Sequence, residues 1–339
     1  MKFKGLLFLI SILILSSSLY AKKMNILVDT FTYKGMSKHS WISAGLTDTV
    51  ISDLNKFSGV TVITEQDRKK AIKEMKLSQY GFISEETAVK VGKMTGANIL
   101  FRGSYQVRGN HIRVHARLIK VVNGSVMKSI KIDGTLNNIF KLQDKVVIKL
   151  MKETKKIYIA GIEPVKIEQN ELKRISKKYK PRALAYEWYS KGLQAQDINP
   201  RKALRYYKRA VDISPHYFNA LNRLGWLYGD LSKYNMALFY YKKAHKVLVS
   251  RNEKNTSDYA SLMNNLGCVY KKKSNYGAAL GYFYKSKMIR ERLGLQDTRG
   301  YGTVMFNIGQ VYSYKNRYDT ALKYYLMDKR ILDRLGRQN

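Results

Sequence analysis

Cysteine is almost absent from this 339-residue sequence. A single thiol, Cys268, excludes an intramolecular disulfide framework and any zinc site built from cysteines. Proline is scarce as well, with 4 residues against 26 tyrosines, a balance that favours packed helices over a loop-rich scaffold. Beyond the first 21 residues, no apolar stretch approaches the length of about 18 residues that a transmembrane helix needs.

Acidic residues are few relative to basic ones. Lys and Arg number 62 and Asp and Glu 25, giving a net charge of +37 that is spread over both halves of the chain. Because 45% of the residues are apolar and 12% aromatic, the chain can bury a core and is not disordered overall. The positive charge makes an anionic membrane or cell-wall surface a candidate partner.

The N-terminus predicts export. Lys2 and Lys4 precede the apolar residues 6–15, and small residues up to Ala21 follow, which is the order found in secretory signal peptides. Ten residues of helix span about 15 Å, roughly half of a bilayer core, so we expect residues 1–21 to be a cleaved signal rather than an anchor. The expected location is the periplasm or cell envelope, and nucleic acid is not an expected partner there.

Residues 24–155 predict an α/β domain with a mixed sheet. Residues 25–32 and 60–63 have the composition of buried strands. Between them an apolar period near 3.6 predicts a helix that Ser40 would cap, and Ser84 would cap a later one. The helix places five apolar side chains on one face, those of Ile42, Leu46, Val50, Leu54 and Phe57.

The second part of this domain predicts an antiparallel meander followed by a helix. Apolar and polar residues alternate over 112–118, and strands 99–107 and 126–132 flank them. Asn123-Gly124 favours a tight hairpin with positive φ at both residues. A helix over 138–151 closes the domain.

An ordered series of motifs runs through residues 74–78 (EMKLS), 83–88 (ISEETA) and 92–97 (GKMTGA). The series resembles the periplasmic domain of CsgG-type curli secretion proteins and the related FlgO and TolB-like envelope domains. The resemblance implies an α/β envelope domain without catalysis that serves protein assembly. The lipidated cysteine and amphipathic hairpins of the CsgG channel are missing here, so its pore function is not transferred.

Residues 183–336 repeat themselves. Gly225, Gly267 and Gly309 recur every 42 residues, each followed three positions later by tyrosine, and an earlier copy is one residue shorter. These residues resemble tetratricopeptide repeats, which implies about four helical hairpins stacked as an all-α solenoid with a concave face. We expect the aromatic that follows each repeated alanine to fill the gap between successive hairpins. The residues expected to pack the repeats are Trp188, Gly192, Ala203, Gly225, Ala237, Gly267, Ala279, Gly309 and Ala321.

The same resemblance implies a groove lined by the first helix of each hairpin. Amides and cations there could hydrogen-bond the backbone or the acidic groups of an extended peptide from an envelope partner. Alternatively, the asparagines only bridge neighbouring helices. The groove candidates are Asn222, Arg223, Trp226, Asn264, Asn265, Lys271, Phe306, Asn307 and Gln310.

Two further segments offer interaction surfaces. Residues 156–182 form a basic linker, expected to be helical, which could bind anionic lipid or cell-wall polymer or could simply be solvated. Its basic patch consists of Lys173, Arg174, Lys177, Lys178, Lys180 and Arg182. The last helix, residues 321–335, has no following cap for its apolar face, which predicts self-association or docking of a partner.

Catalytic and metal-binding patterns are missing. The sequence contains no phosphate-binding loop, nucleophile elbow or zinc-protease motif, and its five histidines form no metal-ligand pattern. The sequence therefore predicts no enzyme, cofactor or metal, but an exported adaptor that binds a protein partner through its repeats. The alternative is a peripheral envelope protein whose basic surface binds anionic lipid or cell-wall polymer while the repeats oligomerise. A third reading is a hydrolase or ligand sensor in the α/β domain.

Overall fold

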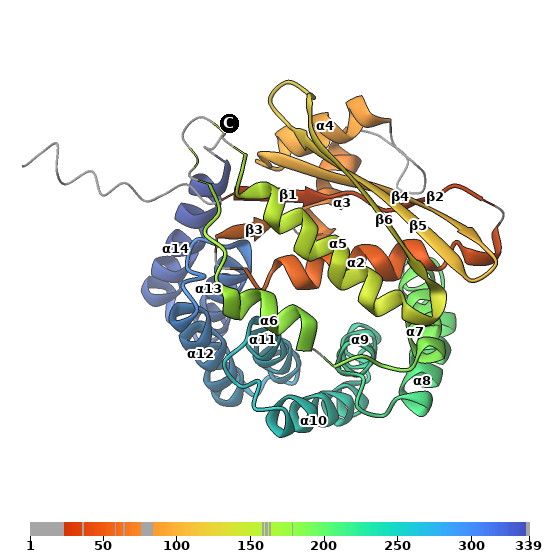
Figure 1. The fold of residues 1–339 in the computed structure, drawn as a ribbon. Coiled ribbons are helices and arrows are strands. Elements are labelled where there is room, and N and C mark those ends of the chain that lie inside the picture. Colours follow the sequence, from red (N-terminus) through yellow and green to blue (C-terminus); the bar gives the residue numbers. More distant parts are fainter. Residues whose placement is uncertain are drawn as a thin grey trace, which may run out of the picture.

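The computed structural model describes residues 24–35, 37–57, 59–63, 65–75, 84–157, 159, 162, 164–177 and 179–336. The expected signal peptide 1–21, part of the motifs at 74–78 and 83–88, and Lys178 of the basic patch lie outside these residues. The described chain contains an N-terminal α/β part and a C-terminal array of helices (Figure 1).

The sheet is mixed, as the sequence predicts, and has six strands among the described residues because the strand expected over 25–32 is divided into two. Its order is β3-β1-β4-β5-β6, with β2 paired to β4. β1 runs parallel to β3 and β4, whereas β4, β5 and β6 form the antiparallel meander. The strands are β1 Met24–Val28, β2 Thr32–Tyr33, β3 Val60–Val62, β4 Ile99–Arg108, β5 His111–Lys120 and β6 Val126–Thr135.

The turn between β5 and β6 differs from the tight hairpin expected at Asn123-Gly124. Only Gly124 has a positive φ, +72°, and its N–H donates to the carbonyl of Lys120 across a wider loop. The Asn123 side chain accepts hydrogen bonds from the backbone and hydroxyl of Ser125. Asparagine therefore acts through its side chain here, and only the glycine supplies the left-handed backbone.

Helices cover both faces of the sheet. These are α2 Ile42–Leu54, α3 Glu65–Glu74, α4 Glu85–Met94 and α5 Ile139–Thr154, with short 3-10 helices η1 Ser37–His39 and η2 Leu136–Asn138. Because successive strand residues point to opposite faces, Leu27 and Leu100 pack in the core under α3 and α4. Ile26 and Phe101 belong to the larger core that includes α2 and α5.

Of the two predicted helix caps, one is present and the other is not. The Ser84 hydroxyl accepts from the N–H of Thr87 and caps α4, as expected. Ser40 does not cap α2, because the N-cap position is Trp41 and no side chain caps that end. The apolar stripe of α2 is confirmed for Ile42, Leu46, Val50 and Leu54, which are fully buried. Phe57 is buried too, but it lies beyond the end of the helix at Leu54.

The C-terminal array consists of four helical hairpins, α7–α8, α9–α10, α11–α12 and α13–α14. Their helices are α7 Ala183–Ala195, α8 Pro200–Ile213, α9 Phe218–Asp230, α10 Tyr234–Ser250, α11 Ser257–Lys272, α12 Tyr276–Arg292, α13 Arg299–Tyr314 and α14 Tyr318–Gly336. No helix among the described residues combines the length and apolarity required to cross a membrane.

Each repeated glycine lies under an aromatic ring of its own hairpin. A Cβ added at Gly267 would come within 2.6 Å of the Phe283 ring, and one at Gly309 within 2.7 Å of the Tyr325 ring. Gly192 and Gly225 face Tyr207 and Tyr241 in the same way. Each ring therefore fills the space that the missing glycine side chain leaves within its hairpin, and Phe283 also packs in one core with Val304 and Ile308 of the next hairpin.

The α/β part and the array form one body with a shared core. Tyr186 of α7 is 1% exposed, and its hydroxyl accepts a hydrogen bond from Gln143 of α5. The connecting segment 156–182 packs as a strap, with Ile157, Val165 and Ile175 buried in the same core. Among the described residues of the strap, only those of α6 Gln169–Lys177 are helical.

Candidate functional site: the concave surface of the array

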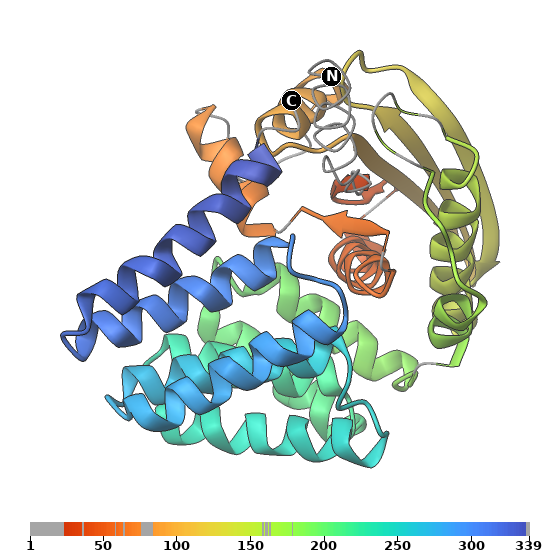
Figure 2. The ribbon, with the colours of Figure 1, turned by 90° about the vertical axis from the view of Figure 1, so that its left-hand side faces the viewer.

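The array curves around α2 and α6 (Figure 1). Figure 2, which views α2 nearly along its axis, shows this helix between β1 and the repeat helices. Gly45 of α2 allows the close crossing with α7, because a Cβ there would lie 2.5 Å from the Tyr186 hydroxyl and closer still to Ser190. We expected the concave surface to be an open groove. Instead, the chain's own α/β part occupies some of it.

Polar contacts fix this arrangement at three places. Asp48 of α2 accepts from the hydroxyl of Tyr189 at 2.8 Å and pairs with Arg223 at 2.9 Å, so it joins the first two hairpins. Lys69 of α3 pairs with Asp197, in the loop after α7. Asp67 of α3 pairs with Arg299 at the start of α13, so contacts reach the fourth hairpin.

Side-chain amides connect successive first helices. Asn265 donates to Asn222 at 3.2 Å, and Asn307 donates to Asn264 at 3.1 Å, so one contact recurs between equivalent positions of consecutive repeats. The bridging alternative for the asparagines is thus present in the structure. Arg223 occupies the position equivalent to Asn265. Asp48 contacts both Arg223 and Tyr189 of α7, and so connects the second hairpin to the first.

Three predicted groove residues remain available beyond these bridges. Trp226 is 41% exposed and Phe306 43% exposed, both unusual for aromatic side chains on packed helices. Lys271 donates to Asn307 at 2.9 Å and to Gln310 at 2.5 Å, so its ammonium group is held in a fixed position. Burial lowers the pKa of Lys271, with Lys272 adding to the effect.

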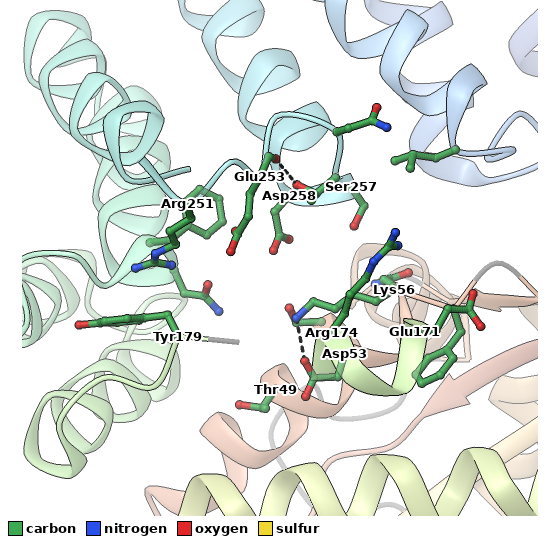
Figure 3. Close-up of a pocket in the computed structure, with 18 of the residues that line it drawn as sticks. Thr49, Asp53, Lys56, Glu171, Arg174, Tyr179, Arg251, Glu253, Ser257 and Asp258 are labelled. Carbon is green, nitrogen blue, oxygen red and sulfur yellow. Dashed lines mark hydrogen bonds and ion pairs between the residues drawn. The ribbon is translucent and has the colours of Figure 1, made fainter. Parts of the chain in front are cut away.

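A polar cavity remains where the array does not touch α2 (Figure 3). Its volume is about 740 Å³, and α2, α6, the start of α9 and the loop between α10 and α11 form its walls. Lys56 and Asp53 of α2 form an ion pair at 3.0 Å on one side. Glu253 and Asp258 project from the opposite wall.

Reasoning from the sequence missed this cavity. Its α10–α11 wall lies in the connection that makes the repeat unit longer than the usual 34 residues, and the 42-residue period was the only signal of it. Thr256 caps α11 by accepting from the N–H of Tyr259, which sets the direction of Ser257 and Asp258 at the cavity rim.

The described side chains of the linker's basic patch, those of Lys173, Arg174, Lys180 and Arg182, are all exposed. Lys180 pairs with Asp144 of α5 at 2.8 Å, whereas Arg174 lines the cavity. The side chain of Lys177 and all of Lys178 lie outside what the structure describes.

The groups that could support other chemistry are occupied or inert. Asp29 at the end of β1 is buried and pairs with Arg68 at 2.9 Å and Arg102 at 3.5 Å. Burial raises the pKa of the Cys268 thiol, which disfavours its reactive thiolate. In the part of the chain that the structure describes, no three His, Cys, Asp or Glu residues gather as metal ligands would.

Residues 258–327 and residues 218–246 each match a sequence model of the tetratricopeptide repeat. The matches fall on the hairpins in which the glycine and alanine pattern recurs. The helical array is a tetratricopeptide repeat array. Repeats of this kind build interaction scaffolds, which agrees with the predicted non-catalytic role of the array.

Other proteins are similar to this chain at low identity. A protein of Rhizobium meliloti (strain 1021) named "Putative adenylate cyclase 3" is 24% identical over 186 residues, which are 53% of this chain and 28% of that protein. The chain thus spans little more than a quarter of that relative, and the named activity is not carried over.

Three solved structures also resemble parts of the chain. BtubC from P. vanneervenii is 20% identical with a TM-score of 0.42, covering 57% of this chain and 73% of that one. The LpoB C-terminal domain from Salmonella enterica is 20% identical with a TM-score of 0.30, covering 38% and 93%. MamA is 18% identical with a TM-score of 0.36, covering 57% and 88%. At TM-scores this low, the likenesses add nothing to the fold described above.

Proposed function

We propose that this protein is an exported, non-catalytic scaffold of the cell envelope that binds a protein partner on the open part of its repeat array. The observation that carries the proposal is the exposure of Trp226 and Phe306 on first helices of an array in which Lys271 is held in place by two side chains. Exposed aromatic and basic side chains are typical of the anchor residues of protein interfaces.

The partner that fits is an extended segment with acidic side chains. Lys271 already has its donors directed by Asn307 and Gln310, so binding an acid there costs little side-chain entropy. The aromatic rings would contact apolar side chains of the same segment. The α/β part, fixed to the array through Asp48, would set the orientation of the whole scaffold in an envelope assembly, as the resemblance to CsgG-type and FlgO-like domains implies.

Site-specific crosslinking in the full-length protein tests this proposal. A photoreactive phenylalanine analogue is placed at position 226 or 306, and in a separate variant at Val122, which is 67% exposed in the β5–β6 turn. The proposal predicts the same dominant crosslinked partner from 226 and 306 and none from 122. Lys271→Gln should weaken capture of that partner. Equal capture from all three positions would show that the array has no special role.

The proposed export needs its own measurement. Mass spectrometry of the protein recovered from the cell envelope should give an N-terminus at Lys22, which corresponds to cleavage after Ala21. A full-length chain starting at Met1 and recovered with the membrane would instead support a retained anchor.

A second function, binding of an anionic lipid or cell-wall surface, is favoured by the charge of the outer helices. Helix α8 carries five basic residues and one acid, and α10 carries three and none. The corresponding first helices α7 and α9 each carry one basic and one acidic residue. Binding to vesicles with anionic lipid that weakens steeply with salt would support this function. Retained binding after neutralisation of the six linker residues would exclude the linker as the site.

A further inference from the structure

The lining of the interdomain cavity differs in charge from the rest of the molecule. The whole chain has 62 basic and 25 acidic residues. The cavity lining contains five acids, Asp53, Glu168, Glu171, Glu253 and Asp258, and four bases, Lys56, Arg174, Arg251 and Arg292. A cavity lined by charged residues in the proportion of the whole chain would contain many more bases than acids. The near balance of acids and bases in this lining therefore indicates a site for a ligand with charges of both signs.

Four charged side chains of the lining lack a hydrogen bond or ion pair among the described residues, those of Glu168, Arg174, Glu253 and Arg292. Glu253 and Arg174 provide one unpaired charge of each sign. Glu253 comes from the array and Arg174 from α6 of the strap, so the two charges approach the cavity from different parts of the chain (Figure 3).

The other charges near Glu253 are already engaged. Lys56 pairs with Asp53 at 3.0 Å, and the Arg251 guanidinium stacks on the Tyr179 ring at 4.1 Å from its centre. Burial raises the pKa of the Glu253 carboxyl, and Arg251 only partly counteracts this. A ligand ammonium group next to Glu253 would remove that electrostatic cost, because an adjacent positive charge favours the carboxylate.

The remaining lining suits a peptide backbone. Five residues with amide side chains line the cavity, Asn55, Gln143, Asn219, Asn252 and Asn255, and an amide can both donate and accept as a peptide group requires. Phe57, Phe140 and Phe218 supply apolar surface beside them. The volume of about 740 Å³ falls within the range of small-molecule sites.

We propose that this cavity binds a short zwitterionic peptide, with its ammonium end at Glu253 and its carboxylate end at Arg174. The site goes beyond the proposed scaffold function, because it lies between α2, the strap and the array rather than at Trp226 and Phe306. A bound peptide would tie the strap to the array and stabilise the folded chain by mass action.

Calorimetry on the full-length protein tests the proposal with four tripeptides that have alanine at both ends and alanine, phenylalanine, lysine or glutamate in the middle. Each is compared with its N-acetylated, C-amidated form. At least one free tripeptide should bind, and its blocked form should bind at least about tenfold more weakly. The same free tripeptide should raise the unfolding temperature.

Variants separate the two ends of the site. Glu253→Gln and Arg174→Gln should each weaken binding by about tenfold or more. The matched control Lys173→Gln, which changes the exposed neighbour of Arg174, should leave affinity unchanged. The proposal is overturned if no free tripeptide binds at about 1 mM, or if free and blocked forms bind equally. Crosslinking at positions 226 and 306 is unaffected by either result, so this failure is distinguishable from failure of the scaffold function.

Discussion

Replacing Gly45 with alanine should weaken the contact between α2 and the first repeat. The added Cβ would lie 2.5 Å from the Tyr186 hydroxyl, far inside normal contact distance. Tyr186 cannot turn aside, because it is 1% exposed, accepts from Gln143 and has Trp41 and Phe140 rings against its own. The two helices would have to separate instead.

The expected magnitude is the difference between two terms. Overpacking of a close contact costs about 1–3 kcal/mol. Alanine is better than glycine within a helix by about 0.5–1 kcal/mol, which partly offsets that cost. Gly45→Ala should therefore lose up to about 2.5 kcal/mol of unfolding free energy.

Gly281→Ala is the matched control. Gly281 lies inside α12, and a Cβ there would meet nothing within 4 Å. The same chemical change should thus stabilise the protein by about 0.5–1 kcal/mol. Urea unfolding followed by circular dichroism gives both values. If Gly45→Ala stabilises the protein as much as Gly281→Ala does, the close crossing described here does not exist.

Three further predictions concern the array. Gly267→Leu should destabilise the protein by several kcal/mol, since its side chain would displace the fully buried Phe283 ring, and a wild-type melting curve would contradict the hairpin packing. Burial, then Lys285 and Lys254, lower the pKa of His245, so the folded state favours the neutral ring and should lose stability as pH falls below about 6.5. His245→Gln should reduce that pH dependence in urea melts between pH 7 and 5. The exposed Leu322 and Met327 of α14 should support self-association, and a monomeric mass by light scattering at micromolar concentration would rule it out.

The elements of this fold were largely predictable because each follows from local sequence. The 3.6-residue period of α2 and the alternation in β5 report burial within a few neighbouring residues. The repeated glycine predicts the hairpins, since its lack of a side chain is a local property that recurs every 42 residues. Helix caps and turn types were less predictable. Ser40 favours a cap and Asn123 favours a turn, but the role of each depended on the length of its loop and on which backbone groups lay nearby.

The occupancy of the concave surface could not be predicted in this way. Asp48 and Arg223 are 175 positions apart, and no sequence pattern around either residue predicts their contact. Asparagines at 222 and 264 looked like groove residues because their spacing fits both a groove and a bridge. The cavity likewise exists only because the strap and the array meet, so its lining comes from segments that are separate in the sequence.

The central claim is that the α/β part lies on the concave face of the array, and a double-mutant cycle between Asp48 and Arg223 tests it most directly. Unfolding free energies are measured for wild type, Asp48→Asn, Arg223→Gln and the double variant. A partly buried ion pair at 2.9 Å should give a coupling energy of about 1 kcal/mol or more. Effects that add to within about 0.3 kcal/mol would mean that the two residues do not meet, and would contradict the arrangement.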